Sequence, residues 1–342
     1  MNDTFPTIAI AGATGLVGRT MLRVLEEHNF PVGTLRLLAS KRSAGAVIEW
    51  KGTNYTVEEL THDSFRGVDI ALFSAGGAAS KEFAPSAAAS GCVVIDNSSA
   101  WRMHPDAPLA VPEVNSHTLK NHHGIIANPN CSTIQLVVAL KPLHEAFGLK
   151  RVVVSTYQSV SGAGQKGVDH LAAEIEKREP TNRISPHQIA YNAVFHSFID
   201  NSGFSEEEIK VRKETRRILE LPDLRVAVTC VRVPVLGGHG ESVNIETEKP
   251  LTVEKLREVL GSADGITIQD NPLENHYPTP LQSGGKDDVF VGRIRIDDTI
   301  ENGAYLWIVS DNLHKGAATN AVQIAEKLLE MNCLAFTKLS SW

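Results

Sequence analysis

The sequence contains little cysteine, no excess of positive charge and no long apolar run. Its four cysteines, Cys92, Cys131, Cys230 and Cys333, lie far apart and form no CxxC pair, so we expect neither a disulfide framework nor a zinc site. The 33 basic residues are outnumbered by 40 acidic ones, which gives a formal net charge of -7 and no general attraction to nucleic acid or anionic membranes. No segment reaches the length of a membrane span, and the first residues lack the features of a signal peptide. We therefore expect a cytoplasmic protein without a metal ion, nucleic acid or membrane as partner.

The chain does contain enough residues for two hydrophobic cores, because single domains usually have about 100–200 residues and this chain has 342. In the first third, short apolar runs alternate with helical segments, an order that is typical of a parallel sheet with crossover helices. The expected strands are 7–11, 35–39, 70–74 and 93–96, and the expected helices are 18–28 and 80–90.

After Cys131 the pattern changes to β-rich segments with longer helical stretches among them. We expect strands within 151–158, 225–234, 240–247, 289–296 and 304–310, and helices within 167–178 and 205–219. This order predicts a mixed α+β domain with a largely antiparallel sheet. The amphipathic segment 317–329 is expected to form a final helix that packs on the first domain. The predicted domains are therefore residues 1–130, completed by residues 314–342, and residues 131–313.

A glycine-rich turn follows the first expected strand, with Gly12, Gly15 and Gly18 at three-residue intervals. Between a strand and a helix, such a turn lets backbone N–H groups approach a pyrophosphate, which predicts a Rossmann-type dinucleotide-binding domain. The alternative is a tight turn with a purely structural role.

The end of the second expected strand indicates which dinucleotide binds. NAD sites usually place an acidic residue there, but residues 37–43 read Leu-Leu-Ala-Ser-Lys-Arg-Ser and contain no acid. The planar guanidinium of Arg42 suits a 2′-phosphate, so we expect NADP(H). The alternative is that Lys41 and Arg42 are solvated loop charges.

Residues 128–133, Asn-Pro-Asn-Cys-Ser-Thr, precede an apolar run at 134–143. Ser132 and Thr133 are good helix-starting residues, so Cys131 is expected at or beside a helix N-terminus. The unpaired N–H groups there favour an anion, which lowers the pKa of a thiol, and the thiolate is the nucleophile. The alternative is a buried cysteine that serves as a small hydrophobic residue.

With these motifs, the chain resembles the bacterial type of aspartate-semialdehyde dehydrogenase over nearly its whole length. The matching blocks are the 12–18 turn, 39–45, 96–99 with Arg102, 111–115, 128–133, 157–164, 232–234 with His239, and 310–313. The resemblance implies an NADP-binding Rossmann-type first domain and a catalytic and dimerisation α+β second domain, as in glyceraldehyde-phosphate dehydrogenases. It also implies a homodimer or a dimer of dimers.

Members of this family use NADPH to convert 4-aspartyl phosphate into L-aspartate 4-semialdehyde, and release phosphate. The step feeds the synthesis of lysine through diaminopimelate, and of threonine, isoleucine and methionine. The resemblance assigns the thioester-forming nucleophile to Cys131, orientation of the substrate to Gln158, and acid–base catalysis to His239. Histidine suits that role because its proton moves near neutral pH. Considered alone, Gln158 is also readable as a polar residue at a strand end, and His239 as an ordinary loop residue.

The substrate carries a carboxylate and a phosphate, so its site needs fixed cations. The resemblance assigns Arg232 to the α-carboxylate, and Arg102 with Lys210 to the phosphate. Glu207, three residues before Lys210 on the same helix face, is the candidate for the substrate ammonium. The neighbouring acids at 206 and 208 remain alternatives.

The residues expected to bind the cofactor lie in four groups. They are Gly12, Thr14, Gly15, Leu16, Val17 and Gly18; Ser40, Arg42 and Ser43; Ser74, Ala75 and Gly76; and, on the nicotinamide side, Ser161, Gly162 and Asn312. The chain departs from the family pattern at 53–65 and 336–342, which leaves the adenine and quaternary contacts open.

Three other interpretations are weaker. N-acetyl-glutamyl-phosphate reductase usually frames its cysteine as Gly-Cys-Tyr-Pro-Thr, whereas this chain has Asn-Cys-Ser-Thr. A glyceraldehyde-type dehydrogenase would more often carry an acid after the second strand. A catalytically silent paralogue that serves as a binding module should have lost Cys131, Gln158, Arg232 or His239, and all four are present.

Overall fold

The structure, a computed structural model, describes residues 5–339 and divides into two compact units. Unit 1 comprises Met1–Pro129 and Ala317–Trp342, and unit 2 comprises Asn130–Gly316. We expected the first boundary after residue 130 and the second after residue 313. In the structure these boundaries fall after residues 129 and 316. Among the described residues, no helix combines the length and the apolar character needed to cross a membrane.

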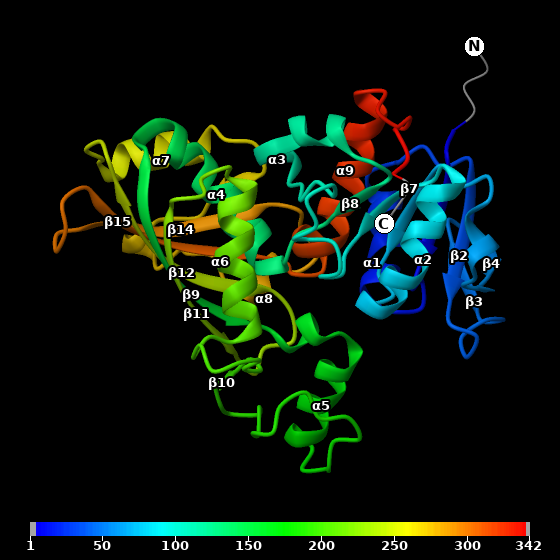
Figure 1. Ribbon diagram of the computed structural model, residues 1–342. Helices are drawn as coiled ribbons and strands as arrows, with labels where there is room; N and C mark the ends of the chain where they lie inside the picture. Colours follow the sequence, from blue (N-terminus) through cyan, green and yellow to red (C-terminus); the bar gives the residue numbers. More distant parts are fainter. Residues whose placement is uncertain (1–4, 340–342) are drawn as a thin grey trace. The chain divides into compact units, whose positions relative to one another are not determined.

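Unit 1 contains a six-stranded sheet in which every neighbouring pair of strands is parallel (Figure 1). The strand order is β5-β2-β1-β6-β7-β8. The bounds are β1 Thr7–Ala11, β2 Thr34–Ala39, β5 Glu58–Glu59, β6 Ile70–Phe73, β7 Val93–Asp96 and β8 Ile125–Ala127. The inner strands are almost wholly buried, as expected for parallel strands that are covered on both faces. The parallel sheet predicted from the alternating pattern is confirmed.

The helices of unit 1 are α1 Leu16–Glu27, α2 Gly77–Ser90, α3 Pro112–Asn115 and α9 Thr319–Glu330. Helices α1 and α2 begin two and three residues before their predicted starts, because Gly15 and Gly76 serve as their N-caps. Helix α9 follows a π-helical turn at His314–Ala318 and packs against α1. A short hairpin, β3 Val47–Trp50 and β4 Thr53–Thr56, was not predicted.

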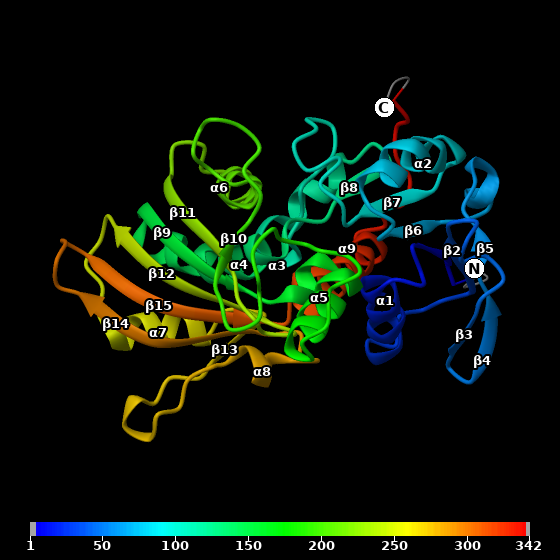
Figure 2. The same cartoon turned by 90° about the horizontal axis from the view of Figure 1, so that it is seen from below.

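Unit 2 contains a seven-stranded mixed sheet in the order β10-β11-β9-β12-β15-β14-β13 (Figure 2). The bounds are β9 Leu149–Gln158, β10 Val194–Phe195, β11 Arg225–Arg232, β12 His239–Thr247, β13 Ile266–Ile268, β14 Val289–Asp297 and β15 Gly303–Ser310. Four neighbouring pairs are antiparallel, whereas β11 with β9 and β13 with β14 are parallel. The largely antiparallel sheet is thus confirmed, while the two short strands β10 and β13 were missed.

Helices α4, α6 and α7 cover one face of this sheet (Figure 1). The helices of unit 2 are α4 Cys131–Phe147, α5 Gln165–Ile175, α6 Glu206–Ile218, α7 Val253–Gly261 and α8 Pro280–Ser283. On β9, Val152, Val154, Thr156 and Gln158 are buried, and the residues between them are partly exposed. This alternation places the buried side chains on the face that the helices cover.

Candidate active site

Cys131 is the first residue of helix α4. Asn130 caps the helix: its Oδ1 accepts the backbone N–H of Ser132 at 3.0 Å and of Thr133 at 3.3 Å. The expected position of Cys131 at a helix N-terminus is confirmed, but the cap is Asn130 and not a hydroxyl residue after the cysteine. The remaining N–H groups of the first turn and the positive end of the helix dipole favour a negative charge on the sulfur.

The strand register of unit 2 brings together three residues that are far apart in the sequence. Arg232 on β11 is paired with Gln158 on β9, which is paired in turn with His239 on β12. Side chains at paired positions of neighbouring strands lie on the same face of a sheet. The three residues therefore form one row at the end of the sheet, on the side that α4 covers.

Cys131 meets this row at His239, where its Sγ lies 3.2 Å from the ring Nε2. The imidazole is completely buried. On its other side, the backbone N–H of Ser159 donates to Nδ1 at 3.1 Å. Burial, and then the charge of Arg232, lower the pKa of His239 to about 3, so the ring is neutral near pH 7.

Glu207 on α6 is hydrogen-bonded to the same row. Its Oε1 accepts the side-chain amides of Asn130 at 2.7 Å and Gln158 at 3.0 Å, and its Oε2 lies 3.6 Å from Nζ of Lys210. Burial by itself raises the pKa of Glu207. The charges of His196 and Lys210 and the two amide hydrogen bonds outweigh burial and bring this pKa to about 2, so the carboxylate is ionised.

The three consecutive acids of α6 have different surroundings. Glu206 lies on the exposed side, with Oε1 2.7 Å from Nζ of Lys210. Glu208 accepts two backbone N–H groups, that of the helix N-cap at 2.7 Å and that of Cys230 at 3.1 Å. Glu207 is the one of the three that is bonded to Gln158, which agrees with its choice as the candidate for the substrate ammonium.

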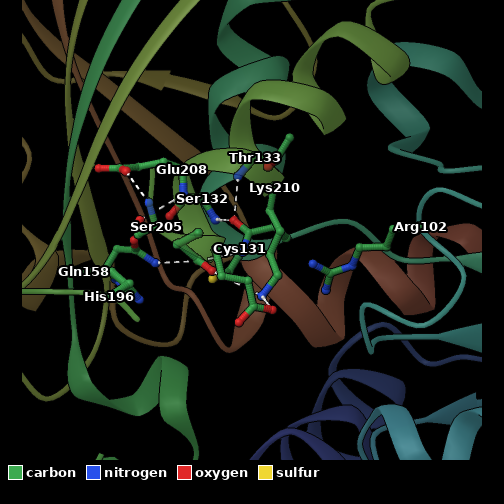
Figure 3. Close-up of polar contacts among 12 residues, drawn as sticks. Arg102, Cys131, Ser132, Thr133, Gln158, His196, Ser205, Glu208 and Lys210 are labelled. Atoms are coloured by element: carbon green, nitrogen blue, oxygen red, sulfur yellow. Dashed lines mark hydrogen bonds and ion pairs between the residues drawn. The ribbon is translucent and has the colours of Figure 1, made fainter. Parts of the chain in front are cut away.

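A pocket of about 240 Å³ lies beside the row, and Glu207, Lys210, Arg232 and His196 are among its lining residues. Figure 3 shows Gln158, His196 and Lys210 around Cys131. Arg232 donates from Nη1 to the carbonyl oxygen of Ser159 at 2.6 Å and from Nη2 to Nδ1 of His196 at 3.4 Å. The pocket thus combines two carboxylates, Glu206 and Glu207, with two cations, and Glu206 is paired with Lys210. Both signs of charge match a ligand that carries an ammonium group as well as anionic groups.

His196 was missed by the sequence analysis, because it lies in the irregular segment after the two-residue strand β10, where no periodic pattern exists. Arginine can only donate, so Nδ1 of His196 accepts from Arg232 and the neutral ring carries its proton on Nε2. Among the described residues this Nε2 has no hydrogen-bond partner, although it is buried. Burial and the nearby cations lower the pKa of His196 to about 4, against the opposing charge of Glu207.

The expected nicotinamide-side residues lie close to His239. The amide Nδ2 of Asn312 donates to Oγ of Ser161 at 3.0 Å, and both side chains are buried. Gly162 is exposed, and a Cβ added to it would lie 3.4 Å from the ring of His239 and 3.5 Å from Nη1 of Arg232. Glycine at this position therefore leaves room beside the row of Arg232, Gln158 and His239.

The other expected cofactor residues lie on three loops of unit 1 at one edge of its parallel sheet. Residues 12–18, 40–43 and 74–76 follow the carboxyl ends of β1, β2 and β6, which are neighbours in the sheet. Helices α1 and α2 begin in two of these loops, and neither has an acidic residue in its first turn or a side-chain cap bond. This edge therefore presents free helix N-termini of the kind that bind phosphate groups.

Close backbone packing explains two of the glycines in the turn. Gly12 has a φ of +91°, and a Cβ there would lie 2.6 Å from the carbonyl oxygen of Ser74. A Cβ at Gly18 would lie 2.3 Å from the carbonyl oxygen of Gly12. Both positions thus require glycine for structural reasons, and the resulting tight turn is also the one that exposes the start of α1.

Arg42 lies in the turn after β2 and is exposed, and Ser43 is half-buried beside it. The backbone of the turn is closed by the N–H of Ser43, which donates to the carbonyl of Ser40 at 2.8 Å. The side chain of Arg42 is therefore available to a ligand at the edge described above.

Arg102, which belongs to unit 1, is buried. Its Nε donates to the carbonyl oxygen of Asn128 at 3.0 Å, and its Nη2 donates to that of Asn97 at 2.9 Å. The guanidinium therefore joins the segment before Cys131 to the loop after β7. Its predicted contact with phosphate stays a prediction.

The sequence matches two family profiles. Residues 7–122 match the semialdehyde dehydrogenase NAD binding domain, and residues 140–315 match the semialdehyde dehydrogenase dimerisation domain. An aspartate-semialdehyde dehydrogenase of Aquifex aeolicus (strain VF5) is 55% identical over 332 residues, which cover 94% of this chain and 98% of the relative.

Two solved structures are similar to this chain in fold as well as in sequence. Aspartate semialdehyde dehydrogenase II from Vibrio cholerae, complexed with ASA, is 46% identical with a TM-score of 0.91, and the match covers 95% of this chain and 98% of that one. Aspartate semialdehyde dehydrogenase with NADP from Candida albicans is 26% identical with a TM-score of 0.75, over 96% and 99% of the two chains. From its sequence, its two domains and its fold, the chain belongs to the aspartate-semialdehyde dehydrogenase family.

Proposed function

We propose that this chain catalyses the NADPH-dependent conversion of 4-aspartyl phosphate into L-aspartate 4-semialdehyde and phosphate, and the reverse phosphorylating oxidation. The observation that carries the proposal is the 3.2 Å contact between Sγ of Cys131 and Nε2 of His239 at the start of α4. The pocket that Arg232 and Glu207 line, with two carboxylates and two cations, supports an amino-acid substrate that carries a phosphate.

In the reductive direction, the thiolate of Cys131 attacks the acyl carbon of 4-aspartyl phosphate. A carbon–sulfur bond forms, the carbon–oxygen bond to phosphate breaks, and phosphate leaves with the electron pair. NADPH, when bound, supplies the hydride that reduces the resulting thioester. The carbon–sulfur bond then breaks, so that the aldehyde leaves and the thiolate is regenerated. The covalent nucleophile divides one difficult displacement into two easier steps. His239 is assigned, from the resemblance, to acid–base catalysis at the reacting sulfur and oxygen atoms.

The pocket supplies a partner for each charged group of the substrate. Arg232 is assigned to the α-carboxylate, for which a guanidinium held by the carbonyl of Ser159 is geometrically apt. Glu207 is assigned to the ammonium group, and Gln158, fixed by its bond to Glu207, orients the acyl group beside Cys131. Lys210, which also lines the pocket, is assigned to the phosphate group.

The assignment of Arg102 to phosphate rests on the resemblance, and two of its donors, Nε and Nη2, bind backbone carbonyls.

NADP(H) is proposed as the cofactor of unit 1. The helix starts behind Gly15 and Gly76 fit the pyrophosphate, and Arg42 with the hydroxyls of Ser40 and Ser43 fits a 2′-phosphate. The presence of NADP in the related Candida albicans structure supports this choice.

We further propose a homodimer formed through the sheet face that α4, α6 and α7 leave uncovered, with a tetramer as a second possibility. Tyr157 is 40% exposed on this face, and its ring lies 5.7 Å from that of Trp307. Tyr277, with 43% exposure, lies at a nearby hollow of about 540 Å³ that Trp307 also lines. Exposed aromatic residues gathered on one face are typical of protein interfaces. The expected setting is the cytoplasmic synthesis of lysine, threonine, isoleucine and methionine.

The test is the phosphate-dependent reduction of NADP by the purified chain with aspartate semialdehyde, followed by the absorbance of NADPH. We expect turnover that requires phosphate and that Cys131→Ser abolishes, while NADPH binding, measured by fluorescence, survives. Cys333→Ser is the matched control, because Cys333 is also a half-buried cysteine but belongs to the C-terminal segment of unit 1.

Turnover by the Cys131→Ser variant would refute the thioester. Activity with N-acetyl-glutamate semialdehyde in place of aspartate semialdehyde would point to the related reductase, and binding of NADP without turnover of either substrate would point to a silent paralogue.

A further inference from the structure

A wholly buried carboxyl group lies two residues along β12 from His239. It belongs to Glu241, whose side chain is on the same face of the sheet as that of His239, the face that α4 covers. Glu241 is completely inaccessible to solvent. In the strand register it is paired with Thr156 on β9 and with Ile308 on β15. Neither of these neighbours brings a charge to the carboxyl group.

Gln135 faces this carboxyl group from α4. It follows Cys131 by four residues, so the two side chains share one face of the helix, and it is also completely buried. Its Oε1 accepts the hydroxyl of Ser310 at 2.6 Å, and Ser310 is the strand partner of His239. Its amide acts on Glu241. Gln135 therefore connects the start of α4 to two positions that adjoin His239 in the sheet.

Nothing in the surroundings of Glu241 compensates a negative charge. Neither of its oxygens has a hydrogen-bond partner among the described residues, and no hydrogen bond of normal geometry reaches Nε2 of Gln135. On β11, the thiol of Cys230 is uncharged, because burial raises its pKa. His239, on the same strand, is neutral near pH 7. A carboxylate at this position would therefore be an isolated buried charge, which is very costly in a protein interior.

The titratable groups of the two nearest helices do not change this result. On α4, Cys131 shares the helix face of Gln135, and on α6, Glu207 and Glu208 act on Cys230. All three are acids, so none of them would stabilise a negative charge on Glu241. Burial accordingly raises the pKa of Glu241 well above the ordinary value, against the smaller opposing effect of Gln135.

Resting on the function proposed above, we propose that Glu241 is a positioning residue: it is held as an uncharged carboxylic acid between α4 and the sheet, and together with Gln135 it fixes the position of Cys131 relative to His239. An uncharged carboxylic acid has both a donor and an acceptor, so it can face an amide without adding a charge to the site. The acid–base role assigned to His239 is unchanged, and Glu241 takes no part in proton transfer.

The direct test is infrared difference spectroscopy of the full chain, wild type minus Glu241→Gln, at pH 7. Glutamine keeps the shape of the side chain and is uncharged, so the difference isolates this one group. We expect wild type to show the C=O stretching band of a protonated carboxylic acid, which the variant lacks. The bands of a carboxylate in its place would overturn the proposal.

Urea unfolding at pH 5 and pH 8 is an independent test. Above pH 4.5 the unfolded chain releases the proton of Glu241 and the folded chain keeps it, so this group makes wild type less stable as the pH rises. Glu241→Gln cannot ionise. We therefore expect it to be more stable than wild type at pH 8, with a smaller gain at pH 5.

Asp297→Asn is the matched control for the unfolding experiment. Asp297 is also buried on a strand of this sheet, but its Oδ1 accepts the hydroxyl of Thr299 at 2.6 Å and its Oδ2 accepts the amide of Asn244 at 2.7 Å. The hydrogen bonds from Thr299, and then that from Asn244, lower the pKa of Asp297, so this variant is expected to lose stability at both pH values. A similar loss in Glu241→Gln at pH 8 would overturn the uncharged state of Glu241.

Glu241→Met and Gln135→Met test the positioning role, because methionine keeps an unbranched shape and removes the polar atoms. We expect kcat to fall about ten-fold or more in each, since small misplacements of reacting groups are costly. The KM for aspartate semialdehyde should change little, because neither residue lines the pocket. The double variant should lose no more than either single variant, and Glu241→Gln should keep a kcat close to that of wild type.

Unchanged kcat in both folded methionine variants would refute the positioning role. A loss in Glu241→Gln as large as that in Glu241→Met would also refute it, since the reaction would then need the ionisable group itself. If the methionine variants do not fold, Glu241→Gln and the infrared spectrum remain decisive. An inactive wild-type chain would refute the proposed function, whereas the infrared and unfolding experiments decide the charge of Glu241 whatever the activity.

Discussion

The three consecutive glutamates at the start of α6 offer a test that separates substrate binding from stability. Glu206, Glu207 and Glu208 have the same chemistry and adjacent positions, but the structure gives them three different sets of contacts. Replacing each in turn by glutamine removes one charge and keeps the shape of the side chain. The three variants are therefore matched controls for one another.

Glu207→Gln is expected to weaken the binding of the substrate. The amide oxygen of glutamine can still accept from Asn130 and Gln158, so the local structure is kept, but the ammonium group of the substrate loses a charged partner. A hydrogen bond to a charged group contributes about 1.5–3 kcal/mol. We therefore expect kcat/KM for aspartate semialdehyde to fall about 10- to 150-fold, at about 1.4 kcal/mol for each factor of ten.

Glu208→Gln is expected to act on stability instead. Its two carboxylate oxygens accept the N–H of Ser205 and the N–H of Cys230, and glutamine has only one oxygen to offer. One buried N–H would lose its acceptor, which costs about 1–3 kcal/mol of the free energy of unfolding. Glu206→Gln removes an exposed ion pair with Lys210, a kind of interaction that contributes at most about 1 kcal/mol.

The assays are steady-state kinetics with varied aspartate semialdehyde and, on the same samples, unfolding by urea. The reasoning predicts a kinetic loss for Glu207→Gln and a stability loss for Glu208→Gln, with small changes in Glu206→Gln. A large increase in the KM for the semialdehyde in either of the other variants, with Glu207→Gln unaffected, would refute the assignment of Glu207 to the substrate.

Two further predictions concern pH and the cofactor. Between pH 8 and pH 5 the free energy of unfolding should fall, because His239 and His196 have pKa values of about 3 and about 4 when folded but 6.5 when unfolded. The unfolded chain therefore binds more protons below pH 6.5, so the stability present above that pH is progressively lost towards pH 4 and below, by about 2 kcal/mol for each histidine at pH 5. His196→Asn should remove its share of this slope in urea unfolding at the two pH values, and an unchanged slope would contradict the burial argument. Arg42→Ala should weaken NADPH about 10- to 150-fold while NADH binding changes little, as measured by fluorescence titration, and an equal loss for both would contradict the 2′-phosphate contact.

The sequence was sufficient to predict the elements whose pattern is local. The apolar strands of unit 1 and the helix that begins at Cys131 are each encoded in a short run of residues, so periodicity and helix-starting residues identify them. Which of Glu206, Glu207 and Glu208 faces the site could not be decided in the same way. Adjacent positions of a helix differ by about 100° around its axis, and only the packing of α6 shows which of the three acids faces Gln158.

The row of Arg232, Gln158 and His239 was beyond prediction from pattern alone, because it depends on strand register. Gln158 and His239 become neighbours only through the pairing of β9 with β12, and Arg232 joins them through β11. A shift of one residue in any pairing would turn its side chain to the opposite face. His196 gave no signal at all, since it belongs to an irregular segment whose position is fixed by tertiary contacts.

The same burial that lowers the two histidine pKa values also sets the charge balance of the site. With neutral histidines, the charged side chains that line the pocket are Arg232 and Lys210 against Glu206 and Glu207, so two positive charges face two negative ones. A proton on either histidine would add a cation beside Arg232 in a site from which solvent is largely excluded. The desolvation that costs stability at low pH therefore also keeps this additional positive charge out of the site near neutral pH. For this reason, a variant that admits water to the row is expected to show a smaller loss of stability between pH 8 and pH 5 in urea unfolding, and an unchanged loss would contradict the burial argument.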